Sequence, residues 1–305
     1  MIAANPRAAA ATVAPFVALT WLVAAAAAAS ADGYDQAPSW LLVLNQLVLA
    51  PVAIAAVLWL GNAVGGRAIA NLSALLYVLL PPLGVLYALS AYRDTYVDRF
   101  LTEAVGVADG GRFPAAALSI AAAALAARAL TGERSKATAL LAGLAAGAGA
   151  LAHPSGALVL VGIGLAYAIA WRPIETALLT AASAPGLALA AAVHGFGLDV
   201  SWSTFTSSMT GLREYLWSNR LLQWLPVAGV IGAARGSLAV ACLLAGWFGA
   251  FAFVYGASPH AGIEDGAYLI AFVPALPAFS LLVGCVPLLV PTLHARLRRA
   301  EVKPS

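Results

Sequence analysis

Long runs of apolar residues constrain this chain more than any other feature of its sequence. Runs of about twenty apolar residues recur along it, and each is long enough to cross a hydrocarbon core about 30 Å thick. Apolar residues make up 62% of the 305 residues and charged residues only 10%, whereas an ordinary soluble domain is about half apolar and a quarter charged. The sequence therefore predicts an all-α, polytopic membrane protein and not a soluble enzyme.

We expect a single transmembrane domain over residues 1–305 that contains about ten transmembrane helices. Their approximate ranges are 9–30, 40–61, 68–90, 114–130, 137–152, 155–171, 174–194, 219–234, 237–255 and 267–291. The outer loops are expected at about 31–39, 91–113, 195–218 and 256–266, and a basic cytoplasmic tail at 292–305. A count of eight or nine remains open, because the fifth and sixth segments are divided only at His153-Pro154-Ser155 and the eighth segment is short.

The placement of charged residues gives an independent indication of orientation, because cytoplasmic connections of membrane proteins hold an excess of Lys and Arg. With the N-terminus inside, the basic residues on the cytoplasmic side are Arg7, Arg67, Arg128, Arg134, Lys136, Arg172, Arg235, Arg296, Arg298, Arg299 and Lys303. The acidic residues outside are Asp32, Asp35, Asp94, Asp98, Glu103, Asp109, Asp199, Glu214, Glu264 and Asp265. Most bases thus lie on one side and most acids on the other, which favours an even number of helices with both termini cytoplasmic.

The first segment has a second interpretation, as a signal peptide. Ala29-Ser30-Ala31 has the small-x-small form of a signal peptidase site. The apolar stretch is longer than a usual signal core and only Arg7 precedes it, so we favour a retained helix. Either way, the residues after it lie outside.

The loop after the third segment holds the first candidate catalytic residues. Asp94 and Asp98 are four residues apart and would share one face of a helix. Two carboxylates at this spacing, with Arg93 and Arg99 beside them, could hold a divalent metal ion or position a general base. The alternative is a solvated interfacial helix whose aromatic residues anchor at the lipid headgroups.

Other candidates lie near the expected outer face. Asp35 follows the first segment, where it could deprotonate an acceptor hydroxyl or simply keep the loop in water. Arg213 and Arg220 suit a phosphate because the planar guanidinium donates two hydrogen bonds at once, although lipid headgroups use arginine for the same reason. His153, next to Pro154, is the only ionisable side chain between the fifth and sixth segments, and it could act in function or sit at the interface.

Three stretches carry a resemblance to a known family. They are residues 140–147 followed by His153-Pro154-Ser155-Gly156, residues 219–226 running to Arg235, and residues 268–277 with Pro274 and Pro277. In this order, they resemble three elements of GT-C superfamily glycosyltransferases. The first resembles the Gly-rich helix with its basic-Pro-Ser/Thr turn, the second the late helix with a basic cytoplasmic turn, and the third the Pro-containing last helix. The resemblance implies a multi-pass protein of the cell membrane that transfers a sugar from a polyprenyl phosphate to an acceptor outside.

On this resemblance, an aspartate acts as base and basic side chains bind the donor phosphate. The chain departs from the family in its first outer loop, which is short where members usually have a long loop with the catalytic acid. Ala267 stands where Arg is frequent, and His153 where Arg or Lys is more usual. The implied residues are Asp35, Asp94 and Asp98 for the base, and Arg93, Arg99, His153, Arg213 and Arg220 for the phosphate.

Other classes of function have less support. The chain lacks a Walker lysine motif, a Gly-x-Ser-x-Gly elbow and His-Glu-x-x-His, and a net charge of +3 gives no reason to expect a nucleic-acid partner. A non-catalytic membrane partner of an active transferase remains an alternative. A transporter is less favoured, because the segments contain few central ionisable residues and no internal repeat.

Overall fold

The computed structural model describes residues 6–32, 36–87, 93–131, 135–195, 200–215, 220–258 and 267–291. Nearly all of these residues are helical, and the extended pairing among them is limited to an isolated antiparallel bridge between Gln36 and Ala108. The described part of the chain is therefore all-α, as the apolar runs predict.

The N-terminal half contains α1 (Pro6–Ser30), α2 (Ser39–Val43), the π-helix η2 (Leu44–Leu49), α3 (Ala50–Tyr87), α4 (Arg93–Thr95), the π-helix η4 (Tyr96–Leu101), α5 (Thr102–Ala104) and α6 (Arg112–Thr131). It is followed by α7 (Ser135–Ala152), the 3-10 helix η5 (Pro154–Leu158), α8 (Val159–Ile169), α9 (Pro173–His194), α10 (Trp202–Tyr215) and α11 (Arg220–Gly236). The last elements are α12 (Leu238–Gly256), α13 (Ala267–Phe272), η6 (Val273–Ala275), α14 (Leu276–Cys285) and η7 (Val286–Leu289).

Seven helices within the described residues are long and apolar enough to cross a membrane. They span Ala9–Ser30, Ser39–Leu86, Arg112–Leu130, Ser135–Ala152, Pro173–His194, Leu238–Gly256 and Ile270–Leu289. Pro154–Ile169 is a shorter apolar helix. By length and composition, the chain is a helical membrane protein.

The longest of these stretches folds back on itself at two glycines. Gly65 and Gly66 have non-helical backbones, and Gly66 has a φ of 79°, a conformation that glycine adopts without steric cost. Residues nine apart in a straight helix would lie about 13.5 Å apart along its axis, yet a Cβ on Gly61 would lie 2.7 Å from the Cα of Ala70. The break falls between 61 and 68, where the sequence predicts the end of one segment and the start of the next.

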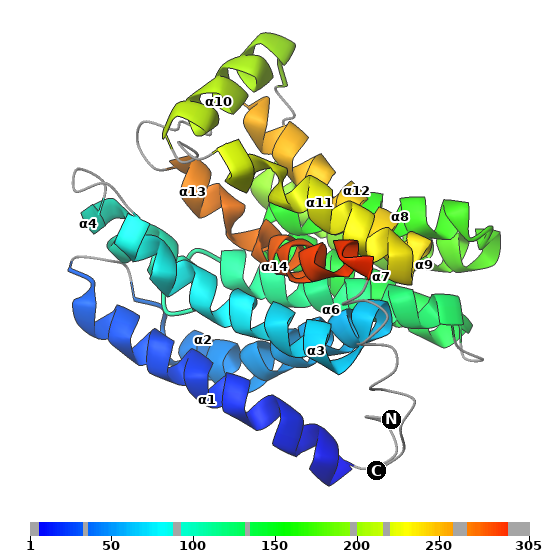
Figure 1. Ribbon diagram of the computed structural model, residues 1–305, viewed down its shortest axis with the longest axis horizontal. Helices are drawn as coiled ribbons and strands as arrows, with labels where there is room; N and C mark the ends of the chain where they lie inside the picture. The colour runs from blue at the N-terminus through cyan, green and yellow to red at the C-terminus, as the bar shows by residue number, and fades with distance from the viewer. Residues whose placement is uncertain are drawn as a thin grey trace.

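The core lies where α6 and the last apolar segment meet the other helices near the centre of the bundle (Figure 1). In Arg112–Leu130, 61% of the apolar stretch is buried, and in Ile270–Leu289 67%, against 17% for the peripheral α1. Glycines allow α7 and α9 to approach closely, because Gly143 lies against the Leu179 carbonyl and Gly147 against Ser183 and Gly186. These small residues therefore serve the packing of α7 against α9.

Prolines break the last apolar segment. Pro274 lies in the 3-10 helix η6 and Pro287 in the 3-10 helix η7, with α14 between them. Proline lacks a backbone N–H and clashes with the preceding turn of an α-helix. In contrast, α3 continues through Pro81 and Pro82 to Tyr87, so these two prolines do not end a helix.

Contacts between connecting segments fall into two sets. In one set, Arg235 donates to the Leu288 and Leu289 carbonyls at 3.1 and 2.8 Å, and Arg172 donates to the Leu130 carbonyl at 3.3 Å. In the other set, the backbone N–H of Ala37 donates to Val107 at 3.0 Å, His194 contacts the Leu151 carbonyl at 2.9 Å, and Ser201 donates to Ala257 at 3.0 Å. Each contact joins two connections, or the segment ends beside them, that the sorting of charges assigns to the same side.

Candidate functional site

The described part of the segment after α3 packs inwards on the bundle. It contains α4, η4 and α5, and Tyr96 and Phe100 of η4 are 8% and 4% exposed. The Tyr96 hydroxyl donates to the Pro81 carbonyl at 2.9 Å. The suggestion that these aromatic residues anchor in lipid headgroups is therefore wrong, because they are buried against protein.

The predicted aspartates Asp94 and Asp98 have different environments. Asp94 is exposed on α4, whereas Asp98 is half-buried on η4 and accepts a hydrogen bond of 2.9 Å from the backbone N–H of Asp32. Asp98 thereby joins the connection after α1 to η4. Asp35 lies outside the described residues. Within the described part of the chain, no three His, Cys, Asp or Glu side chains gather as a metal site would require.

The structure does not test the predicted phosphate site, because it describes the side chains of only two of the four arginines. Arg93 and Arg99 are exposed on α4 and η4. Arg213 lies in α10 and Arg220 begins α11, and the orientation of both side chains lies outside what the structure describes. These four residues remain predictions.

Glu103 and Arg112 form a buried ion pair that the sequence did not indicate. Both residues follow Asp98 in the chain. Glu103 of α5 contacts Arg112, the first residue of α6, with 2.9 Å between Oε1 and Nη1 and side-chain exposures of 9% and 28%. The second carboxylate oxygen of Glu103 and the Nε of Arg112 are buried without a hydrogen-bond partner. Burial raises the pKa of the Glu103 carboxyl, an effect that Arg112 opposes and Asp109 reinforces.

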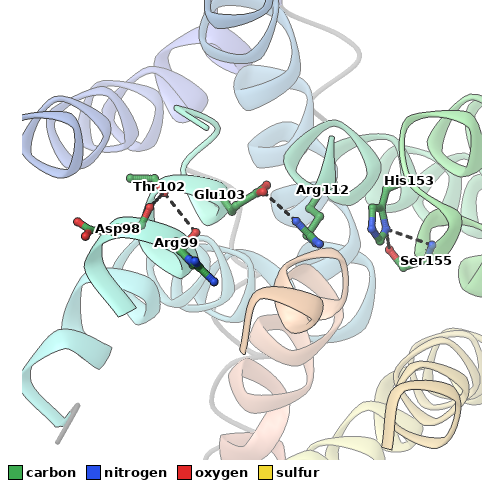
Figure 2. A network of polar contacts seen from close by, with 7 residues as sticks. All are labelled: Asp98, Arg99, Thr102, Glu103, Arg112, His153 and Ser155. Carbon is green, nitrogen blue, oxygen red and sulfur yellow. Dashed lines mark hydrogen bonds and ion pairs between the residues drawn. The ribbon is translucent and has the colours of Figure 1, made fainter. Parts of the chain in front are cut away.

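His153 lies on the other side of Arg112 from Glu103, at the junction of α7 and η5 (Figure 2). Its Nδ1 accepts from the Ser155 backbone N–H at 3.3 Å and lies 2.7 Å from the Ser155 hydroxyl. Since Nδ1 is an acceptor, the proton of the neutral imidazole is on Nε2. Burial, followed by the charges of Arg112 and His194, lowers the pKa of His153 to about 3, so the ring is neutral at physiological pH.

Two carboxamides of the π-helix η2 extend this polar region. Asn45 donates to the Gly106 carbonyl at 2.9 Å and Gln46 donates to the Val105 carbonyl at 2.7 Å, while both side-chain carbonyl oxygens are buried without a partner. The Trp21 indole donates to the backbone carbonyl of Gln46 at 2.9 Å. Single-turn π-helices occur frequently at functional sites. Two adjacent carboxamides inside an apolar segment were a signal in the sequence that could have pointed here.

A small cavity lies beneath the residues that follow Glu103. Ala104, Val105 and Phe113 line it on one side, and Tyr77 and Pro81 of α3 on another. Its volume of about 10 Å³ corresponds to roughly one water molecule. It is therefore too small to hold a sugar in this conformation.

Comparisons with protein-family models, with curated proteins and with solved structures gave no match to this chain. The candidate site consequently stands on its geometry. It is a row of Asp98, Glu103, Arg112 and His153, contributed by η4, α5, α6 and the turn before η5, in which the Asp98 carboxylate at one end points away from Glu103 (Figure 2).

Proposed function

We propose that the chain is a cell-membrane glycosyltransferase with ten transmembrane helices and both termini in the cytoplasm. It transfers a sugar from a polyprenyl-phosphate donor to an acceptor on the outer face. The two sets of contacts between connections support this topology, because they agree with an alternating path of the chain and with the sorting of charges. The break at Gly65 and Gly66 supports counting the longest apolar stretch as two helices.

The row of Asp98, Glu103, Arg112 and His153 is the observation that carries the proposal. In an inverting transfer, the acceptor oxygen bonds to the anomeric carbon as the bond from that carbon to the phosphate oxygen breaks. A carboxylate takes the hydroxyl proton, and cationic or N–H donors stabilise the phosphate that leaves. Glu103 and Asp98 offer carboxylates, while Arg112 and the Nε2–H of His153 offer donors at the same end of the bundle.

Sugar transfer can be measured with purified protein in liposomes that contain an undecaprenyl- or decaprenyl-phosphate-linked hexose or pentose. We expect release of polyprenyl phosphate by the natural chain, a loss of at least tenfold in Asp98→Asn or Glu103→Gln, and no change in the control Lys136→Gln, which alters an exposed residue at the other end. A chelator arm tests whether a divalent ion takes part. Absence of release with every donor would overturn the proposal.

A non-catalytic membrane partner of such an enzyme is the second candidate. The observation that favours it is the cavity of about 10 Å³, because a catalytic pocket for a sugar must be much larger. This alternative predicts that a second membrane chain co-purifies in equal amount and that the isolated protein turns over no donor. A monomeric protein with turnover would exclude it.

A further inference from the structure

Trp171, between α8 and α9, has a backbone conformation that tryptophan rarely adopts. Its φ is 53°, and among the described residues no other non-glycine residue has a positive φ. The left-handed region is sterically unfavourable for a bulky L-residue, whereas glycine adopts it without steric cost. An observed outlier of this kind points to a role for the side chain that compensates for the strain.

The conformation of Trp171 follows from the way in which α8 ends. The backbone N–H of Arg172 donates to the Tyr167 carbonyl at 2.9 Å, and that of Trp171 donates to the Ala168 carbonyl at 3.1 Å. These two bonds form a Schellman motif, a helix ending in which glycine usually occupies the left-handed position that Trp171 has here. Pro173 then begins α9. The helix ending therefore sets the left-handed conformation, and contacts of the indole do not.

The Trp171 side chain contributes little to the packing of the bundle. It is 85% exposed, more than any other large hydrophobic residue in the described part of the chain. Ile169 and Ile174, on either side of it, are also exposed. Arg172, in contrast, is attached to the bundle, because it donates to the Leu130 carbonyl of α6 at 3.3 Å. The backbone of the turn is thus fixed to the protein, while the indole is left to its surroundings.

The lengths of the adjoining helices place Trp171 near the boundary of the hydrocarbon core. At rises of about 2.0 Å per residue in a 3-10 helix and about 1.5 Å in an α-helix, η5 and α8 together are roughly 27 Å long, and α9 is roughly 33 Å long. Both start level at the far side, since His194 at the end of α9 contacts the Leu151 carbonyl just before η5. The hydrocarbon core is about 30 Å thick. Neither helix is long enough to carry Trp171 far beyond it.

We propose that Trp171 is a membrane anchor, whose indole lies in the layer between lipid headgroups and acyl chains on the side that the sorting of charges assigns to the cytoplasm. Tryptophan is enriched in this layer because its ring is apolar and its N–H finds partners among the headgroups. Phospholipid in contact with the indole gives the exposed side chain the role that the strained backbone requires. The anchor does not depend on whether the chain transfers sugars.

Tryptophan fluorescence of the full chain in phosphatidylcholine vesicles tests the depth of the indole. The chain has eight tryptophans, so the emission of Trp171 is the difference between the natural chain and Trp171→Phe, and Trp171→Gly gives an independent subtraction. The quenchers are phosphatidylcholine brominated close to the headgroup, phosphatidylcholine brominated near the end of the acyl chain, and acrylamide in the water. Trp247→Phe supplies the buried reference, because Trp247 is 1% exposed.

We expect bromine close to the headgroup to quench the Trp171 emission at least about twofold more than bromine near the chain end, while the Trp247 emission responds little to any quencher. Quenching by acrylamide and by neither brominated lipid would overturn the proposal, because the indole would then lie in water. Stronger quenching by the deeper bromine would also overturn it. Emission that none of the three quenches would do so as well, since protein from a second copy would then cover the indole.

Discussion

Replacement of Arg112 by Met removes one partner of the buried ion pair and leaves the other in place. Breaking a fully buried pair in this way costs about 3–5 kcal/mol. Here the Arg112 side chain is 28% exposed and that of Glu103 9%, so water partly screens the pair and we expect a loss of about 2 kcal/mol at neutral pH. Glu103→Gln should cost less, because it leaves the more exposed of the two charges.

The pH dependence of Arg112→Met follows from the remaining carboxyl. Arg112 lowers the pKa of Glu103 and burial raises it, so the pKa rises further when the guanidinium is gone. A carboxyl whose pKa is higher in the folded than in the unfolded state gives stability that is complete below the unfolded pKa of about 4.3 and is lost as pH rises through the folded pKa. Arg112→Met should therefore be less stable at about pH 8 than at about pH 5, by at most about 1.4 kcal/mol per pH unit. Asp109, in the connection between α5 and α6, also acts on the Glu103 carboxyl and raises its pKa.

Equilibrium unfolding in mixed dodecylmaltoside and dodecylsulfate micelles at both pH values measures this effect. The double variant Arg112→Met/Glu103→Gln contains no titrating group at the pair and should lose the extra pH dependence. The double-mutant cycle should give a coupling of about 1–2 kcal/mol. If Arg112→Met and the double variant were equally stable at both pH values, the pair would not exist in the form described.

Three further predictions concern other parts of the molecule. Gly162→Ala places a Cβ against the backbone of α12 and should destabilise the fold by about 1–3 kcal/mol in the same unfolding assay. In the control Gly164→Ala, the added Cβ meets nothing within 4 Å, and the variant should be neutral or stabilising. Gln36→Cys with Ala108→Cys should form a disulfide with copper phenanthroline across their antiparallel bridge, detected as a mobility shift on a non-reducing gel that dithiothreitol reverses, and failure to cross-link would count against this pairing. Because the pKa of His153 is lowered to about 3, its contribution to stability should be complete above about pH 6.5 and decline as pH falls, so His153→Gln should reduce the acid sensitivity of unfolding.

Much of the fold is predictable from the sequence because hydrophobic length has a direct physical meaning in a bilayer. The apolar runs predict helices, and the pair Gly65-Gly66 and the prolines of the last segment lie where those helices break. The inward packing of η4 is different, since it depends on the Tyr96 hydroxyl reaching the Pro81 carbonyl. From the sequence alone, this segment cannot be distinguished from an interfacial helix with aromatic anchors.

The candidate site is less predictable. Asp98 and His153 stand out in the sequence as polar residues beside apolar segments, but the pairing of Glu103 with Arg112 spans an irregular turn whose path is set by Gly106 and Gly111. Residues nine apart have no fixed relation unless the backbone between them is known. Glu103 within its apolar surroundings was the signal available, and only the structure shows which cation it meets.

The sidedness of the bundle tests the central claim most directly, because it decides whether the polar row faces outwards. Asp109→Cys and Lys136→Cys each place a thiol at an exposed residue, one beside Glu103 and one at the opposite end, in a background without the native cysteines. In intact cells, a membrane-impermeant maleimide should label the Asp109→Cys protein, and should label the Lys136→Cys protein only after the cells are opened. Labelling of Lys136→Cys but not Asp109→Cys in intact cells would contradict the account.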